Sequence, residues 1–164
     1  MPFDQAHWIP VAQKILNSEL ERRLLGVGRP LLGLDDASLE PPKLWFGVTS
    51  YYTPTHADPA DNLVLQISGQ KRVWLSPPTS YGALQPTCVA EQCWANATFG
   101  AFARSAGAST PVAEVLRRVQ AVNLTLSAGE LLYLPAGWFH CVANLEPTVM
   151  VNVWTRGQER VGVP

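Results

Sequence analysis

The sequence predicts a mainly β protein with the topology of an eight-stranded, double-sheet jelly roll. Short runs of alternating polar and apolar residues fill most of the chain after residue 43, and Gly- or Pro-containing turns separate them. Four runs precede an insertion and four follow it, which is the number of strands in a jelly roll. The length of 164 residues suits one domain, residues 1–164, with its core over 43–155.

The segment before the predicted barrel, residues 1–42, is expected to contain a helix. In VAQKILNSELERRLL (11–25) the apolar residues recur at helical spacing, and Gly26 and Gly28 can end the helix ahead of Pro30. The apolar face of this helix must pack on the barrel or on a partner. A homodimer is one of the arrangements that would cover it.

Four predicted strands precede the insertion and four follow it. They are KLWFGV (43–48), YYTPTHA (51–57), NLVLQIS (62–68), KRVWLS (71–76), AVNLTL (121–126), ELLYL (130–134), WFHCVAN (138–144) and TVMVNVW (148–154). The insertion, 77–120, begins as a Pro-rich loop and ends in TPVAEVLRRVQ, where Thr110 can cap a helix and Pro111 suits its first position. The prediction is therefore a jelly roll with an N-terminal helix and a helical insertion between strands four and five.

Charge and composition argue against two classes of partner. The net charge is −1 and only 15% of residues are charged, so no basic surface for nucleic acid is expected. No apolar run approaches the roughly 20 residues of a membrane helix. The N-terminus does not resemble a signal peptide, so an intracellular location, cytoplasmic or nuclear, is expected. The cysteines Cys88, Cys93 and Cys141 form no CxxC pair and are predicted to be buried or idle thiols in a reducing compartment.

Two of the three histidines are candidates for a metal site. His56 and Asp58 are two residues apart at a strand end, so an extended backbone turns both side chains to one side. His140 is on the seventh predicted strand, which a jelly roll can place beside the second. A histidine followed two residues later by an acid is common by chance, but this context favours a facial triad of two histidines and one carboxylate, typical of non-haem iron oxygenases.

Lys71 is a candidate anion-binding residue. It begins the fourth predicted strand, on the same side as Val73 and Leu75. A lysine on an apolar, inward-facing side is costly to bury unless it meets an anion, such as the far carboxylate of a dicarboxylate. An exposed hairpin lysine remains the alternative.

These motifs together resemble the JmjC-type, cupin-like Fe(II)- and 2-oxoglutarate-dependent oxygenases. The resemblance covers 43–155 and rests on LWFG, TPTHADPADNLVLQISGQKRVWLSPP, LSAGELLYLPAGWFHCV and VNVW, in this order and spacing. It implies a cupin-type barrel, the double-stranded β-helix. It also implies a hydroxylase that uses Fe(II) and O2 and converts 2-oxoglutarate to succinate and CO2 while hydroxylating a protein side chain or a small molecule.

The resemblance also assigns roles to individual residues. It implies three metal ligands, two residues that hold the C5 carboxylate of 2-oxoglutarate, and two asparagines that line the co-substrate pocket. A tryptophan beside the last ligand is expected to be scaffold. The metal ligands are His56, Asp58 and His140. The residues that hold the C5 carboxylate are Lys71 and Thr53, the pocket asparagines are Asn62 and Asn152, and the tryptophan is Trp138.

The chain also departs from this family, which leaves several questions open. Many protein hydroxylases of the family have longer N-terminal regions and C-terminal helices, so the substrate-facing regions look reduced here, and the prime substrate is not predicted. Which of Tyr51, Tyr52 and Tyr133 would contact 2-oxoglutarate is open as well. Two alternatives remain: a non-catalytic cupin-type binding or scaffold protein, and a histone lysine demethylase, since demethylation is hydroxylation of an N-methyl group.

Overall fold

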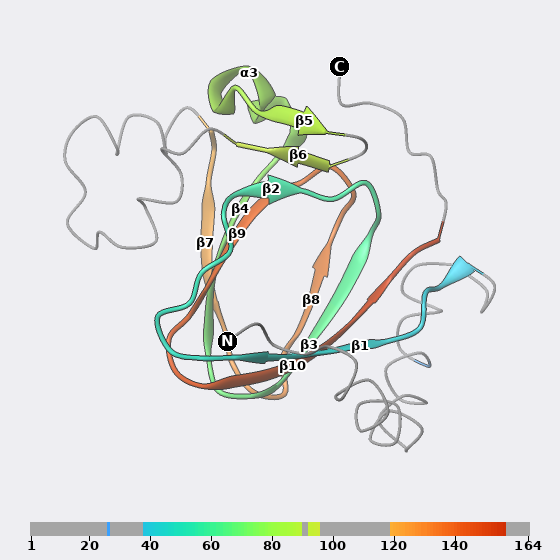
Figure 1. Ribbon diagram of the computed structural model, residues 1–164, viewed down its shortest axis with the longest axis vertical. Coiled ribbons are helices and arrows are strands. Elements are labelled where there is room, and N and C mark those ends of the chain that lie inside the picture. The colour runs from blue at the N-terminus through green and yellow to red at the C-terminus, as the bar shows by residue number, and fades with distance from the viewer. Residues whose placement is uncertain (1–25, 27–37, 90–91, 96–118, 157–164) are drawn as a thin grey trace.

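The computed structural model describes residues 26, 38–89, 92–95 and 119–156, which form two antiparallel sheets facing each other. One sheet has the strand order β1-β10-β3-β8, and the other β5-β6-β2-β9-β4-β7 (Figure 1). The strands are β1 (Lys43–Gly47), β2 (His56–Ala57), β3 (Asn62–Ser68), β4 (Lys71–Ser76), β5 (Thr87–Val89), β6 (Gln92–Trp94), β7 (Val122–Leu126), β8 (Leu131–Leu134), β9 (Phe139–Asn144) and β10 (Thr148–Trp154). Two short helical turns, η2 (Pro78–Ser80) and α3 (Tyr81–Leu84), follow β4.

The predicted jelly roll is confirmed, and all eight predicted strands are present. The strand expected over 51–57 is much shorter, because only His56 and Ala57 form β2. Pro54 has no N–H to donate, which interrupts the ladder ahead of β2, and Tyr52 makes only an isolated bridge to Ala143.

The insertion contains strands that the sequence did not predict. β5 and β6 form a hairpin that pairs with β2 and extends the second sheet. The helix predicted over 11–25 lies outside the described residues, as does nearly all of the one predicted over 110–120, whose last two residues form a turn. Within the described part of the chain, no helix is long and apolar enough to cross a membrane.

The prediction of idle thiols is wrong for two of the three cysteines. Cys88 and Cys93 are opposite each other in the β5–β6 hairpin and form a disulfide. Sequence reasoning missed the disulfide because it did not predict the hairpin that aligns the two cysteines. Cys141 is free and buried, and burial raises the pKa of its thiol to about 11, as expected for an unreactive core cysteine.

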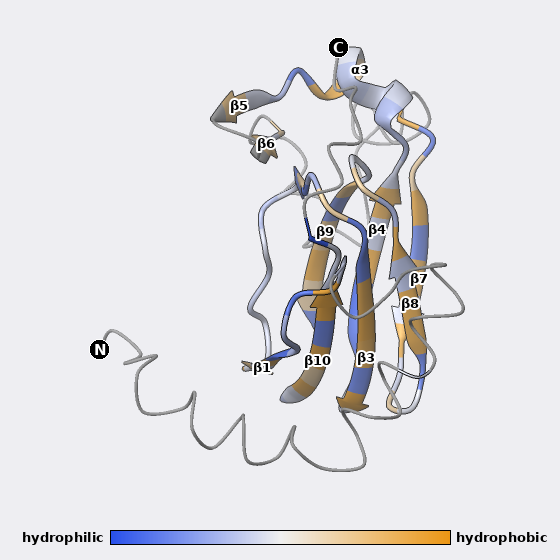
Figure 2. Ribbon diagram, turned by 90° about the vertical axis from the view of Figure 1, so that its right-hand side faces the viewer, coloured by the Kyte–Doolittle hydropathy of each residue, from blue (hydrophilic) through white to orange (hydrophobic). Residues whose placement is uncertain are grey.

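One hydrophobic cluster lies between the two sheets, and alternation along the strands explains its composition. A second cluster, which includes Ala57, Leu84 and Phe139, packs beneath α3. Val64 on β3 packs with Val73 and Leu75 of β4, together with Leu126 and Leu134 from β7 and β8. Figure 2 shows the hydrophobic residues concentrated on the paired strands. Because side chains alternate, the residues that share these inward faces are Asn62 and Gln66 on β3 and Lys71 on β4. The barrel interior is therefore apolar in its middle and polar where Asn62, Gln66 and Lys71 lie.

Candidate functional site

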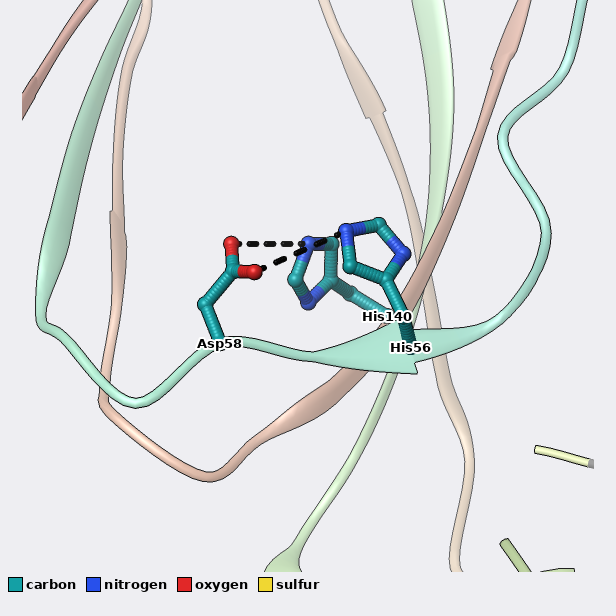
Figure 3. Close-up of side chains that lie close together, drawn as sticks. All are labelled: His56, Asp58 and His140. Carbon is teal, nitrogen blue, oxygen red and sulfur yellow. Dashed lines mark ion pairs between the residues drawn. The ribbon is translucent and has the colours of Figure 1, made fainter. Parts of the chain in front are cut away.

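The three predicted metal ligands come together at one end of the barrel. β2 and β9 are neighbours, and His56 and His140 are directly opposite each other in the ladder. Asp58 follows β2, and its two carboxylate oxygens each lie 3.8 Å from an imidazole Nε2, one from His56 and one from His140 (Figure 3). These separations are too long for hydrogen bonds, and ligand atoms from the three residues all lie within 4.8 Å of one another. The arrangement leaves room for an ion between the three side chains.

Hydrogen bonds to backbone carbonyls orient both imidazoles for metal binding. His56 Nδ1 lies 2.8 Å from the Pro54 carbonyl oxygen, and His140 Nδ1 lies 3.1 Å from that of Trp138. A carbonyl oxygen can only accept, so each Nδ1 carries a proton, and in the neutral ring the lone pair is then on Nε2, the atom that faces Asp58. This is the tautomer that a metal-binding histidine needs.

The surroundings of His140 keep it neutral. Burial, and then the neighbouring His56, lower its pKa to about 4, against the opposing effect of Asp58. The ring centroids of the two histidines are 4.2 Å apart. On the other side of His56, the Trp94 ring of β6 stacks at 4.8 Å. The unpredicted hairpin thus forms one wall of the ligand cluster.

Two backbone donors hold the loop after β2 against the loop before β9. Gly137 N donates to the Asp58 carbonyl oxygen and Ala136 N donates to Asp61 Oδ1, both at 2.8 Å. Asp61 is buried, and its main chain is also paired with Thr155. These bonds fix the position of Asp58 relative to His140. Sequence reasoning missed Asp61, although a second acid in HADPAD was a visible signal.

Lys71 lies at the opposite end of the same strands from the ligand cluster. In the β4–β9 ladder Leu75 is opposite His140, Val73 opposite Val142, and Lys71 opposite Asn144. Four residues of strand separate the two ends, or about 13 Å along the backbone. Only 6% of Lys71 is exposed, which rules out the exposed-lysine alternative, and burial lowers its pKa to about 8. Its Nζ donates to Asn144 Oδ1 at 2.8 Å.

Thr53 lies between these two ends. Its backbone N donates to the Val142 carbonyl oxygen at 2.8 Å, and its Oγ1 accepts from Val142 N at 3.1 Å. Because the hydroxyl oxygen accepts that bond, its own proton can be donated to another group. Thr53 is therefore held against β9, between the rows of His140 and Asn144.

The two predicted pocket asparagines are buried and bonded to each other. Asn152 Nδ2 donates to Asn62 Oδ1 at 3.1 Å, and the indole Nε1 of Trp45 donates to Asn152 Oδ1 at 2.8 Å. An indole N–H can only donate, so it fixes the direction of both amides. This pair does not use the Asn62 Nδ2 protons, which can be donated to a further acceptor. The sequence offered no specific sign of the part played by Trp45.

The remaining aromatic candidates have separate places. Tyr52 is half-buried and bridges to β9, whereas Tyr51 and Tyr133 are exposed. Tyr133 alternates with the core residues Leu132 and Leu134 and therefore faces away from the interior. Trp138 packs against the core cluster, as expected of scaffold.

The chain has recognisable relatives. The cupin-like domain family matches residues 3–159. Lysine-specific demethylase JMJ31 of Arabidopsis thaliana is 30% identical over 156 residues, covering 92% of this chain and 28% of that protein. The human bifunctional peptidase and (3S)-lysyl hydroxylase JMJD7 is 32% identical over 127 residues, covering 67% of this chain and 40% of that protein. The chain therefore spans between about a quarter and two fifths of the length of these relatives.

A solved structure shares the fold. The X-ray structure of Escherichia coli ycfD aligns with a TM-score of 0.53 at 18% identity, over 80% of this chain and 29% of that one. The double-sheet barrel is thus common to both proteins. From the match over nearly its whole length and its JmjC-protein relatives, we conclude that the chain belongs to the JmjC/cupin-like oxygenase family.

Proposed function

We propose that the chain carries an Fe(II)- and 2-oxoglutarate-dependent oxygenase centre. In this proposal His56, Asp58 and His140 bind the metal, and 2-oxoglutarate is oxidatively decarboxylated to succinate and CO2 while a second substrate is hydroxylated. The observation that carries the proposal is the pairing of β9 with both β2 and β4. This pairing places the triad beside one end of β9 and the buried Lys71 beside the other end. Family membership supports the same chemistry.

The donor set fits a non-haem iron ion. Two neutral imidazoles and one carboxylate leave three coordination positions for a chelating co-substrate and O2. Iron bound there would supply the activation of O2, and the remaining work belongs to side chains of this chain. The backbone bonds to both Nδ1 atoms keep the rings oriented without the metal.

The residues between the triad and Lys71 would bind and orient 2-oxoglutarate. Lys71 and Thr53 would hold the C5 carboxylate by charge-assisted hydrogen bonds. Val73 and Val142, paired between the two ends, would provide an apolar floor that excludes water. Asn62, on the facing sheet, would donate its Nδ2 protons to the co-substrate. Two fixed ends define one orientation of the dicarboxylate, which favours reaction.

For the second substrate we propose a protein side chain. The name of the JMJD7 relative describes a lysyl hydroxylase, and that of JMJ31 a lysine demethylase. Both reactions replace a C–H bond by C–OH, so the same site chemistry serves either. Formaldehyde release would identify N-demethylation, whereas a stable hydroxylated product would identify hydroxylation.

The test is succinate formation from 2-oxoglutarate by anaerobically reconstituted protein after addition of O2. Wild type and a Glu146→Gln variant, altered at an exposed site, should form succinate slowly even without a second substrate. His56→Ala should not. If wild type binds metal and 2-oxoglutarate yet forms no succinate with any substrate, the scaffold alternative replaces this proposal. If it binds neither, the assigned roles are wrong.

A further inference from the structure

We propose that Asn144 is a positioning residue that presents the Lys71 ammonium to the far carboxylate of the co-substrate. This inference rests on the proposed function and adds a residue to it. Neither the motif nor the resemblance drew attention to Asn144. Its side chain is buried and lies in contact with Lys71 rather than with the metal ligands.

The hydrogen bonds of the Asn144 side chain determine its orientation. Nδ2 donates to the Val48 carbonyl oxygen at 2.9 Å, and a carbonyl can only accept, so this end must be the amide nitrogen. Oδ1 is then the end that faces Lys71, where it accepts from Nζ at 2.8 Å and from Thr148 Oγ1 at 3.3 Å. The opposite amide orientation would turn N–H groups toward an ammonium. The acceptor for Lys71 is therefore fixed.

The main chain of Asn144 is held as firmly as its side chain. Its N donates to the Tyr51 carbonyl oxygen at 2.9 Å, and Ser50 N donates to its carbonyl oxygen at 3.2 Å. These bonds tie β9 to the segment between β1 and β2, which also contains Thr53. Asn144 thus joins both residues proposed to bind the far carboxylate in one hydrogen-bonded frame.

Strand β1, in the facing sheet, leaves room for this amide. A Cβ added at Gly47 would collide with Asn144 Nδ2 and approach Thr148 Oγ1 to 2.6 Å. Glycine at this position of β1 leaves the space that the amide fills.

A neutral acceptor suits this task better than a carboxylate. Asn144 takes one of the three N–H donors of Lys71 and leaves two donors and the full positive charge for a ligand. Among the described residues, no carboxylate forms an ion pair with Lys71. An aspartate at position 144 would neutralise Lys71 and compete with the incoming carboxylate.

The test compares two ligands on metal-loaded protein under anaerobic conditions by calorimetry. One is 2-oxoglutarate, and the other is 2-oxobutanoate, which has the same 2-oxo acid head but no far carboxylate. Asn144→Asp should weaken 2-oxoglutarate binding about tenfold or more, because a charge-assisted bond is lost to competition. It should leave 2-oxobutanoate binding unchanged. Asn144→Ser, which removes the amide without adding charge, should weaken 2-oxoglutarate in the same selective way.

Thr148→Val serves as the matched control. It removes one bond to the same Oδ1 but leaves Lys71 in contact, so 2-oxoglutarate affinity should change less than threefold or so. Equal losses for both ligands in folded Asn144 variants, or no loss for either, would overturn the inference. Lys71→Ala distinguishes failure of the positioning role from failure of the co-substrate site. If it removes the preference for 2-oxoglutarate while Asn144 variants keep it, only the positioning role fails; if wild type shows no preference, the co-substrate site itself is refuted.

Discussion

Removing the Asp61 carboxylate should loosen the metal site although Asp61 is not a ligand. Asp61 Oδ1 accepts the bond from Ala136 N in the loop before β9, and the adjacent Gly137 N bonds to the Asp58 carbonyl oxygen. In Asp61→Ala the Ala136 N–H loses its acceptor in a partly buried place. We therefore expect lower stability together with a metal site whose carboxylate and second histidine are no longer held in register.

The magnitude follows from the kind of bond that is lost. A hydrogen bond to a charged group contributes about 1.5–3 kcal/mol, so the free energy of unfolding should fall by about 2 kcal/mol. For a chain of this length that corresponds to a decrease in Tm of about 4–8 °C. Loss of a group that orients metal ligands usually weakens metal binding about 10–100-fold, and the lower end is expected here.

The assay is a thermal melt of the metal-free protein and a Co²⁺ titration of the folded protein. Glu130→Ala is the matched control, because Glu130 Oε2 also accepts a backbone bond, from Ser127 N, but in an exposed turn. It should cost well under about 1 kcal/mol and leave Co²⁺ affinity unchanged. Asp61→Asn keeps an oxygen acceptor and should recover most of the lost affinity. If Asp61→Ala keeps the wild-type Tm and the wild-type Co²⁺ affinity, the proposed role of Asp61 in holding the metal site is refuted.

Three further outcomes follow from the other buried polar groups. Burial lowers the Lys71 pKa to about 8, so the ammonium loses its proton as the pH rises above 8. The affinity for 2-oxoglutarate should therefore be constant below pH 8 and fall by up to tenfold per pH unit above it. Calorimetry between pH 7 and 9 should show no such change for 2-oxobutanoate. Trp45→Phe removes the indole N–H that orients the Asn152–Asn62 amide pair and should weaken 2-oxoglutarate binding several-fold at unchanged Co²⁺ affinity. An unchanged dissociation constant for 2-oxoglutarate would show that this orientation does not matter for binding. Gly47→Ala should destabilise the fold by about 1–3 kcal/mol in a urea melt, because the new methyl group displaces Asn144, whereas Gly82→Ala, with nothing within 4 Å, should be neutral; equal effects would argue against the close packing.

The sequence predicted those parts of the site that are carried by spacing along one strand. The period-two relation of His56 and Asp58 and the inward side of β4 both follow from alternation, and the structure has both. The strand order of a jelly roll then gave the neighbour that brings His140 opposite His56. These inferences need only local pattern and a known topology.

What sequence reasoning missed depends on contacts between distant segments. Asn144 and Asp61 are polar residues of ordinary types, and their roles come from a register or a loop contact that no local pattern states. The β5–β6 hairpin is three residues a side, too short to show a period, so its Trp94 and its disulfide went unseen. Pro54 shortened a strand that residue composition had favoured.

The buried Lys71 is costly for stability, and its surroundings suggest why it is kept. For stability alone, an apolar residue at position 71 would be better, since burying a lysine costs free energy that one amide contact offsets only in part. The lowered pKa of Lys71 is the sign of that cost. The fold nevertheless gives Lys71 a fixed, uncharged acceptor and keeps it apart from the Asp58 carboxylate, which lies at the other end of the strands. A cation held in place but not neutralised is arranged for an anion that arrives from outside. Its distance from the triad then determines which anions qualify, because a ligand must reach both ends at once.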